Sequence, residues 1–61
     1  MCEANAYIIR DGEEELVMEA VDKVEPENDG LRLVNIFGDQ KFMHAHIHAL
    51  FLVNHKIVLK E

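Results

Sequence analysis

The residue with the most specific chemistry in this 61-residue chain is its single cysteine, Cys2. A thiolate acts as a nucleophile or a metal ligand, so thiolate chemistry is confined to this position. Removal of Met1, which a small second residue permits, would leave Cys2 with an α-amine and a thiol. Nitrogen and thiolate donors closing a five-membered ring suit Ni(II) or Cu(II) in a square plane. The alternative is an inert cysteine half packed under the first strand, because buried cysteine behaves as a small hydrophobe.

The prediction of a metal ligand at Cys2 holds for either form of the N-terminus. If Met1 is retained, the donors become its α-amine, the Cys2 amide and the Cys2 thiolate. Ni(II) can also displace the proton of the next amide, that of Glu3, because metal binding competes with protons for the same donor atoms. A two-fold dimer with both N-termini near its axis would supply two nitrogens and two sulfurs. Those four atoms complete a square plane for one ion.

Three histidines, His44, His46 and His48, alternate along one segment. On a strand they would project from one face at intervals of ~6.6–6.8 Å. Imidazole binds borderline metals such as nickel and zinc, so a weak secondary metal site is one interpretation. No carboxylate or thiol lies nearby in sequence to complete such a site, and we therefore favour a solvated strand face. The fourth histidine, His55, is expected in a turn.

The composition limits the classes of function. The net charge of −6 repels phosphate backbones and removes the counterion-release contribution to affinity, so nucleic acid is not an expected partner. A chain of 61 residues leaves little room for a substrate cleft of ~300 Å³ or more, and we expect no enzyme. Because the chain shows no basic segment followed by an apolar one and no apolar run of about 18 residues, we expect neither a signal peptide nor a membrane-spanning segment. Because a single cysteine cannot form an internal disulfide, we expect the protein in the reducing cytoplasm.

The chain is expected to form one domain, residues 1–61, and to associate as a homodimer. A domain of this size buries only about 60% of its unfolded surface and gains stability from self-association. Turn residues divide it into short segments, of which Asp11-Gly12 suits a two-residue hairpin turn. Glu13–Val24 fits a helical stripe or a strand equally well. Four other segments are predicted as strands: Ala4–Arg10, Leu31–Phe37, Lys41–Val53 and Lys56–Lys60. The strand Lys56–Lys60 is expected to pair with residues 50–53.

Three stretches together resemble one known family. They are Met1-Cys2-Glu3-Ala4-Asn5-Ala6-Tyr7, Leu16-Val17-Met18-Glu19 and Asp29-Gly30-Leu31-Arg32-Leu33-Val34-Asn35-Ile36-Phe37-Gly38. This combination resembles the CooT family of small nickel-binding proteins associated with maturation of carbon monoxide dehydrogenase. The HypC-type chaperones of hydrogenase assembly also begin with Met-Cys, but they continue with an apolar, proline-containing motif that this chain lacks.

The resemblance implies an all-β fold, namely a small SH3-like barrel of about five strands that forms a homodimer. It therefore favours a strand for Glu13–Val24. It also implies that Ni(II) is held through Cys2, and that the protein supports nickel insertion into carbon monoxide dehydrogenase, with this enzyme or its other maturation factors as partners. The competing class is a small-barrel module that binds RNA or protein without a metal role. Net charge and few aromatic residues argue against the RNA version.

Overall fold

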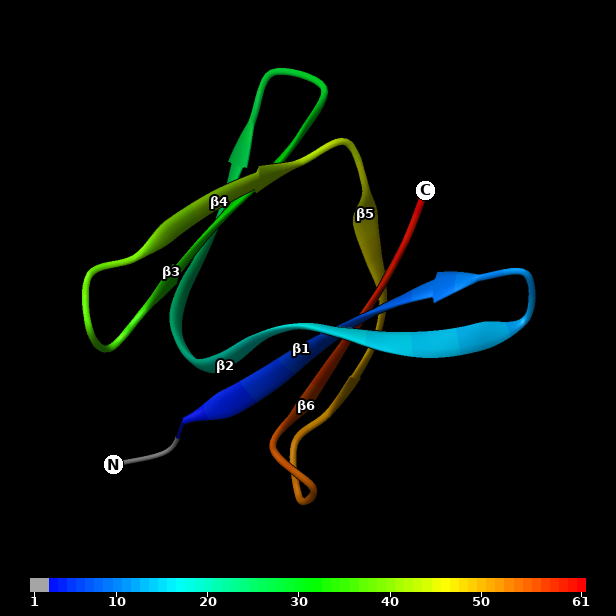
Figure 1. Ribbon diagram of the computed structural model, residues 1–61, viewed down its shortest axis with the longest axis horizontal. Coiled ribbons are helices and arrows are strands. Elements are labelled where there is room, and N and C mark those ends of the chain that lie inside the picture. The colour runs from blue at the N-terminus through cyan, green and yellow to red at the C-terminus, as the bar shows by residue number, and fades with distance from the viewer. Residues whose placement is uncertain (1–2) are drawn as a thin grey trace.

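The computed structural model describes residues 3–61, so Met1 and the predicted ligand Cys2 lie outside the described residues. Residues 3–61 form a single six-stranded sheet, which confirms the all-β prediction (Figure 1). In this part of the chain, no helix has the length and hydropathy needed to cross a membrane. The order of strands across the sheet is β4-β3-β2-β1-β6-β5. Their bounds are β1 Ala4–Arg10, β2 Glu13–Glu27, β3 Gly30–Asn35, β4 Gln40–Met43, β5 His46–Phe51 and β6 Lys56–Lys60.

The first hairpin forms as its turn residues predict. Asp11 and Gly12 have φ angles of 53° and 78°, and Arg10 pairs with Glu13 directly across the turn. Two consecutive positive φ angles match the twist of antiparallel strands, and aspartate followed by glycine tolerates them. The turn therefore makes the segment from Glu13 onward a strand, and the helical alternative is wrong.

Strand β2 bends in its middle and pairs with a different neighbour on each side of the bend. Its residues up to Val21 pair with β1, and the residues from Val21 to Glu27 pair with β3. Ala20 has a φ of 55°, and the register of both ladders shifts near this point. A bulge of this kind turns a strand sharply, which is visible as the corner of β2 in Figure 1. The corner folds the sheet back over its own apolar face.

The prediction of one strand over Lys41–Val53 is wrong, and residues 3–61 form six strands rather than about five. Strand β4 pairs with β3 at one edge of the sheet, and β5 pairs with β6 at the other. The chain must cross between these edges, and it does so at His44 and the buried Ala45. Alternating apolar and polar residues cannot reveal the crossing, because the same alternation continues on both sides of it.

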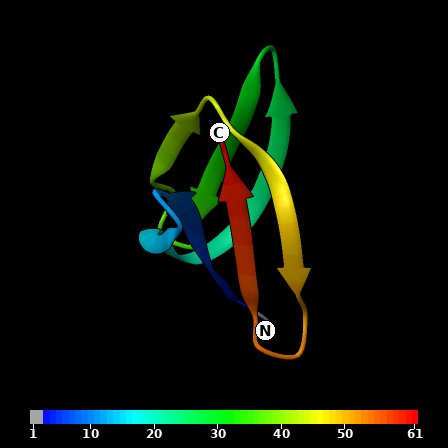
Figure 2. The same cartoon turned by 90° about the vertical axis from the view of Figure 1, so that its right-hand side faces the viewer.

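The core lies between the two halves of the folded sheet. In Figure 2, β6 runs between β1 and β5, and its pairing with β1 is parallel. Ile8, Leu33 and Leu59 are fully buried. The strand predicted over Leu31–Phe37 is confirmed as far as Asn35, with Leu31 and Leu33 buried, but β3 ends there and Phe37 is exposed in the following turn. The buried apolar residues are Ala6, Ile8, Val21, Leu31, Leu33, Ala45, Val58 and Leu59.

Candidate functional site

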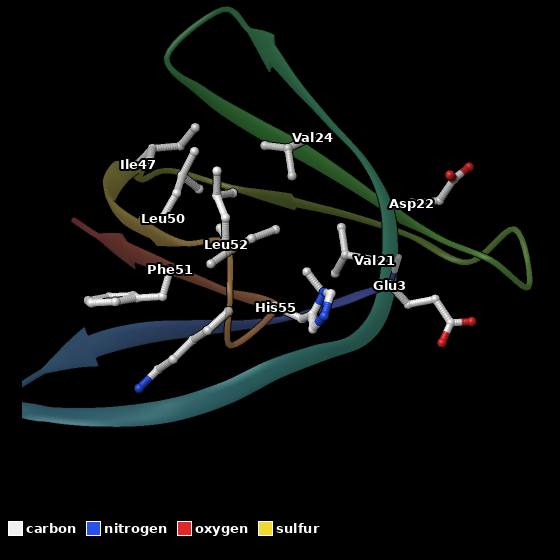
Figure 3. Close-up of a pocket in the computed structure, with 12 residues that line it drawn as sticks. Glu3, Val21, Asp22, Val24, Ile47, Leu50, Phe51, Leu52 and His55 are labelled. Atoms are coloured by element: carbon white, nitrogen blue, oxygen red, sulfur yellow. The ribbon is translucent and has the colours of Figure 1, made fainter. Parts of the chain in front are cut away.

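A groove of about 450 Å³ opens beside the start of β1 (Figure 3). The volume of this groove exceeds the ~300 Å³ of a typical substrate cleft, for which the sequence predicted little room. The groove exists because the folded sheet is open at this end. The first described residue, Glu3, lines the groove, and Cys2 is joined to Glu3 by one peptide bond. The other lining residues come from β1, β2, β5, β6 and one turn: Ala4, Val21, Asp22, Val24, Ile47, Leu50, Phe51, Leu52, His55, Lys56 and Ile57.

Asn5 links the three segments that surround this groove. Its backbone N–H donates to the carbonyl oxygen of His55 at 3.0 Å. Its side-chain Oδ1 accepts a hydrogen bond from the N–H of Ala20 at 3.2 Å, at the bend of β2. The backbone N–H at a bulge is left without a ladder partner, so the asparagine side chain supplies one. Asn5 therefore holds the start of β1 against both the bend and the turn before β6.

We expect the substitution Asn5→Ala to lower the free energy of unfolding by about 1–3 kcal/mol, because the Ala20 N–H would lose its partner in a part-buried position. Chemical denaturation followed by circular dichroism measures this loss. Asn54→Ala is the matched control, since Asn54 is exposed and its side chain makes no hydrogen bond within residues 3–61. Equal stability of the two variants would contradict the structural role of Asn5.

The four histidines do not form a common site. His44 lies in the crossing and packs edge-on against Phe42, with ring centroids 5.0 Å apart. His46 and His48 are exposed on β5, where a bulge between Ile47 and Ala49 interrupts the pairing with β6. The prediction that His44, His46 and His48 project from one face of a single continuous strand is therefore wrong. Within residues 3–61 there is no cluster of three or more histidine, cysteine or carboxylate side chains that could hold a metal ion.

His55 occupies a turn, as predicted, but it also lines the groove. Its φ is 52°, and its N–H donates to the carbonyl oxygen of Leu52 at 3.3 Å across the turn. The sequence alone indicated only the turn, because the groove depends on the pairing of β6 with β1. In Figure 3 the His55 side chain lies among the residues that line the groove, whereas the Glu3 and Asp22 carboxylates point away from the apolar lining.

An exposed apolar surface borders the groove on the side of β5. Leu52 is 78% exposed and Val53 is 91% exposed, in the turn that follows this strand. Ile47, Leu50 and Phe51 on β5 are also exposed, so five apolar residues face solvent within seven positions. Contiguous exposed apolar surface typically marks an interaction site. The sequence alone did not reveal this surface, because all five residues lie within the segment Lys41–Val53, which its alternation predicts as one half-buried strand.

The acidic run Glu13-Glu14-Glu15 at the start of β2 is exposed, and two of its three glutamates pair with cations of the same chain. Glu15 lies 3.2 Å from Arg10, and Glu14 lies 2.6 Å from Lys56. The Lys56 Nζ also lies over the rings of Tyr7 and Phe51, at 5.2 and 5.6 Å from their centroids. This acidic run therefore forms a solvated edge of the first hairpin, with its cationic partners supplied by the same chain.

Comparisons with known proteins agree on one family. The family described as CO dehydrogenase accessory protein CooT matches residues 1–60 of the chain. Among solved structures, a crystal structure of CooT from Carboxydothermus hydrogenoformans is 48% identical in sequence, with a TM-score of 0.92. The match covers 98% of this chain and 97% of that chain. No curated protein matches the sequence.

Proposed function

Because the chain belongs to the CooT family of CO dehydrogenase accessory proteins, we propose that it binds Ni(II) through Cys2 and supports nickel insertion into carbon monoxide dehydrogenase. The family match over residues 1–60 carries this proposal. It supports the role of an accessory factor to the enzyme. The partners would be the enzyme itself or its other maturation factors, in the cytoplasm.

The position of the groove supports a role for the N-terminal residues. Glu3 lines the groove, and the side chain of Asn5 connects this segment to the bend of β2. Such connections limit the freedom of the chain next to Cys2, and a metal site needs ligands held by surrounding contacts. A thiolate with the α-amine or an amide nitrogen is the donor set that Ni(II) accepts in square-planar geometry. Nickel is the cargo here, so its release to the enzyme is part of the proposed role.

The proposal includes a homodimer of SH3-like barrels. The bend of β2 at Ala20 curls the six-stranded sheet, which supports assignment to this class of small barrel. The exposed apolar residues from Ile47 to Val53 lie beside the groove, and a second copy covering them would remove that surface from water. A two-fold axis near this surface would also bring two N-termini together. Two thiolates and two nitrogens would then surround one ion.

Native mass spectrometry of the protein with added Ni(II) tests the proposal. We expect a dimer that retains nickel, because each protomer contributes only part of the donor set. Mg(II) serves as the control, since it prefers oxygen donors and should not be retained. A nickel-loaded monomer would contradict the shared site, and a dimer that retains no nickel would contradict the nickel-binding function. The same spectrum reports whether Met1 has been removed.

A further inference from the structure

The exposed large apolar side chains of residues 3–61 fall into two groups, with Leu16 apart from both. The first group, on β5 and in the turn after it, is the surface that the proposed second copy covers. The second group lies on β4 and in the turn that joins it to β3, at the opposite edge of the sheet from β5. Within residues 3–61 this second group belongs neither to the core nor to the groove lining. Its members are Ile36, Phe37 and Phe42.

Phe37 is the most exposed aromatic residue in the part of the chain that the structure describes, with an exposed fraction of 77%. The other two phenylalanine rings have partners, since Phe42 packs edge-on against His44 and the Lys56 amine lies over Phe51. The Phe37 ring has no aromatic or cation–π contact within residues 3–61. An aromatic ring removes about 150–250 Å² from water when it is covered. This single side chain can therefore contribute much to the binding of a partner.

The turn that presents Phe37 is held by Asn35, the last residue of β3. The Asn35 Oδ1 accepts hydrogen bonds from the N–H groups of Phe37 at 3.0 Å and of Asp39 at 2.9 Å. The backbone N–H of Asn35 donates to the carbonyl oxygen of Asp39 at 3.0 Å, and its carbonyl oxygen accepts from the N–H of Gly38 at 3.1 Å. In Figure 1 this turn projects from one side of the molecule. Because the backbone is fixed on both sides of Phe37, the ring is presented with little freedom to lose, which favours binding.

The surroundings of this turn are acidic. Residues 19–41 contain six acids and three bases, of which one acid and one base pair with each other. The others are exposed and form no ion pair within residues 3–61: the acids Glu19, Asp22, Glu25, Asp29 and Asp39 and the bases Lys23 and Lys41. Two of the acids adjoin the turn, since Asp39 accepts a hydrogen bond from Asn35 and Asp22 follows Val21, which pairs with Asn35. A protein surface that meets this turn therefore needs positive charge around its contact.

We infer that the turn between β3 and β4 docks the protein onto carbon monoxide dehydrogenase, with the Phe37 ring in an apolar pocket of the enzyme rimmed by lysine or arginine side chains. The inference rests on the function proposed above, because delivery of nickel requires contact with the enzyme as well as with the second copy. The two apolar groups then serve different partners. Aromatic residues are enriched at protein interfaces, where a few buried anchors carry most of the binding free energy.

The test measures binding of the wild-type protein and two variants to nickel-free carbon monoxide dehydrogenase immobilised on a biosensor. Phe37→Ser removes an exposed ring, so the variant should fold, and its circular dichroism spectrum should match that of the wild type. Leu16→Ser is the matched control, an exposed apolar residue on β2 outside both groups. We expect Phe37→Ser to weaken binding about thirtyfold or more, as truncation of an interface anchor does. Leu16→Ser should bind like the wild type, and added salt should weaken the binding of both.

The outcomes separate this inference from the proposed function. Equal affinity of the wild type and Phe37→Ser for the enzyme would overturn the inference and leave the proposed function standing. Absence of binding by the wild type would overturn both the inference and the partnership with the enzyme, and nickel retention would then support the metal-binding role alone. Conversion of Phe37→Ser from dimer to monomer, measured by light scattering, would also overturn the inference, because the second copy would then cover Phe37. We expect this variant to keep the nickel affinity and the oligomeric state of the wild type.

Discussion

The substitution Cys2→Ser is expected to abolish tight, stoichiometric Ni(II) binding while leaving the fold intact. A serine hydroxyl does not ionise at neutral pH, so it cannot replace a thiolate as a donor to this metal. The described core is built from residues of the strands and of the crossing at Ala45, and it includes no position before Ala6. Thermal unfolding of the variant should therefore match that of the wild type. Isothermal titration calorimetry with Ni(II) measures the loss of binding directly.

The matched control for Cys2→Ser removes a different sulfur atom. Met18 is half-buried on β2 and packs against the core, so Met18→Leu conserves volume and deletes a thioether. We expect this variant to bind Ni(II) as tightly as the wild type. Tight binding retained in Cys2→Ser would contradict the nickel function proposed for Cys2. Loss of binding in both variants would instead indicate damage to the fold.

A second large effect is expected at the centre of the sheet. Leu33 on β3 is fully buried, and Leu33→Ala should destabilise the protein by about 2–5 kcal/mol through lost burial and the remaining cavity. Native proteins have about 0.05–0.15 kcal/mol of stability per residue, or about 3–9 kcal/mol for a chain of this length. The variant should therefore lose much of its stability. Its midpoint of thermal unfolding should fall by about 8–40 °C, since each kcal/mol lowers the midpoint of a domain of this size by about 4–8 °C.

Leu16→Ala is the control for this prediction. Leu16 lies on β2, is 50% exposed, and does not line the groove. The same atoms are removed, so the difference between the two variants reports burial alone. We expect the control to cost at most about 1 kcal/mol. Both variants must be compared at one protein concentration, because dimer formation would make the midpoint depend on concentration. Equal losses would contradict the assignment of Leu33 to the core.

The local features of the fold were predictable from the sequence. Asp11-Gly12 specifies its hairpin turn because two adjacent residues determine the φ angles that close it. The strand Ala4–Arg10 and the strand Lys56–Lys60 have the predicted bounds, because short apolar segments between turn residues indicate strands directly. The resemblance to the CooT family, carried by residues quoted from the sequence alone, is confirmed by the family match.

The features that depend on distant contacts were not predictable in this way. The crossing at His44 and Ala45 exists because β4 and β5 pair at opposite edges of the sheet. The bend at Ala20 needs its partner Asn5, fifteen residues earlier in the chain. Neither the alternation of side chains nor the residue types near these positions contain that information, because the pairing partners lie elsewhere in the sequence.

The sequence by itself determined that thiolate chemistry in this protein belongs to Cys2, because no other cysteine exists in the chain. It also indicated an all-β fold and the family. The tertiary structure decided which residues lie next to the start of β1. Parallel pairing of β1 with β6 joins Asn5 to His55, and it opens the groove between Glu3 and the apolar residues of β5. Residues fifty positions apart meet there only because a parallel pair requires a long connection between its strands.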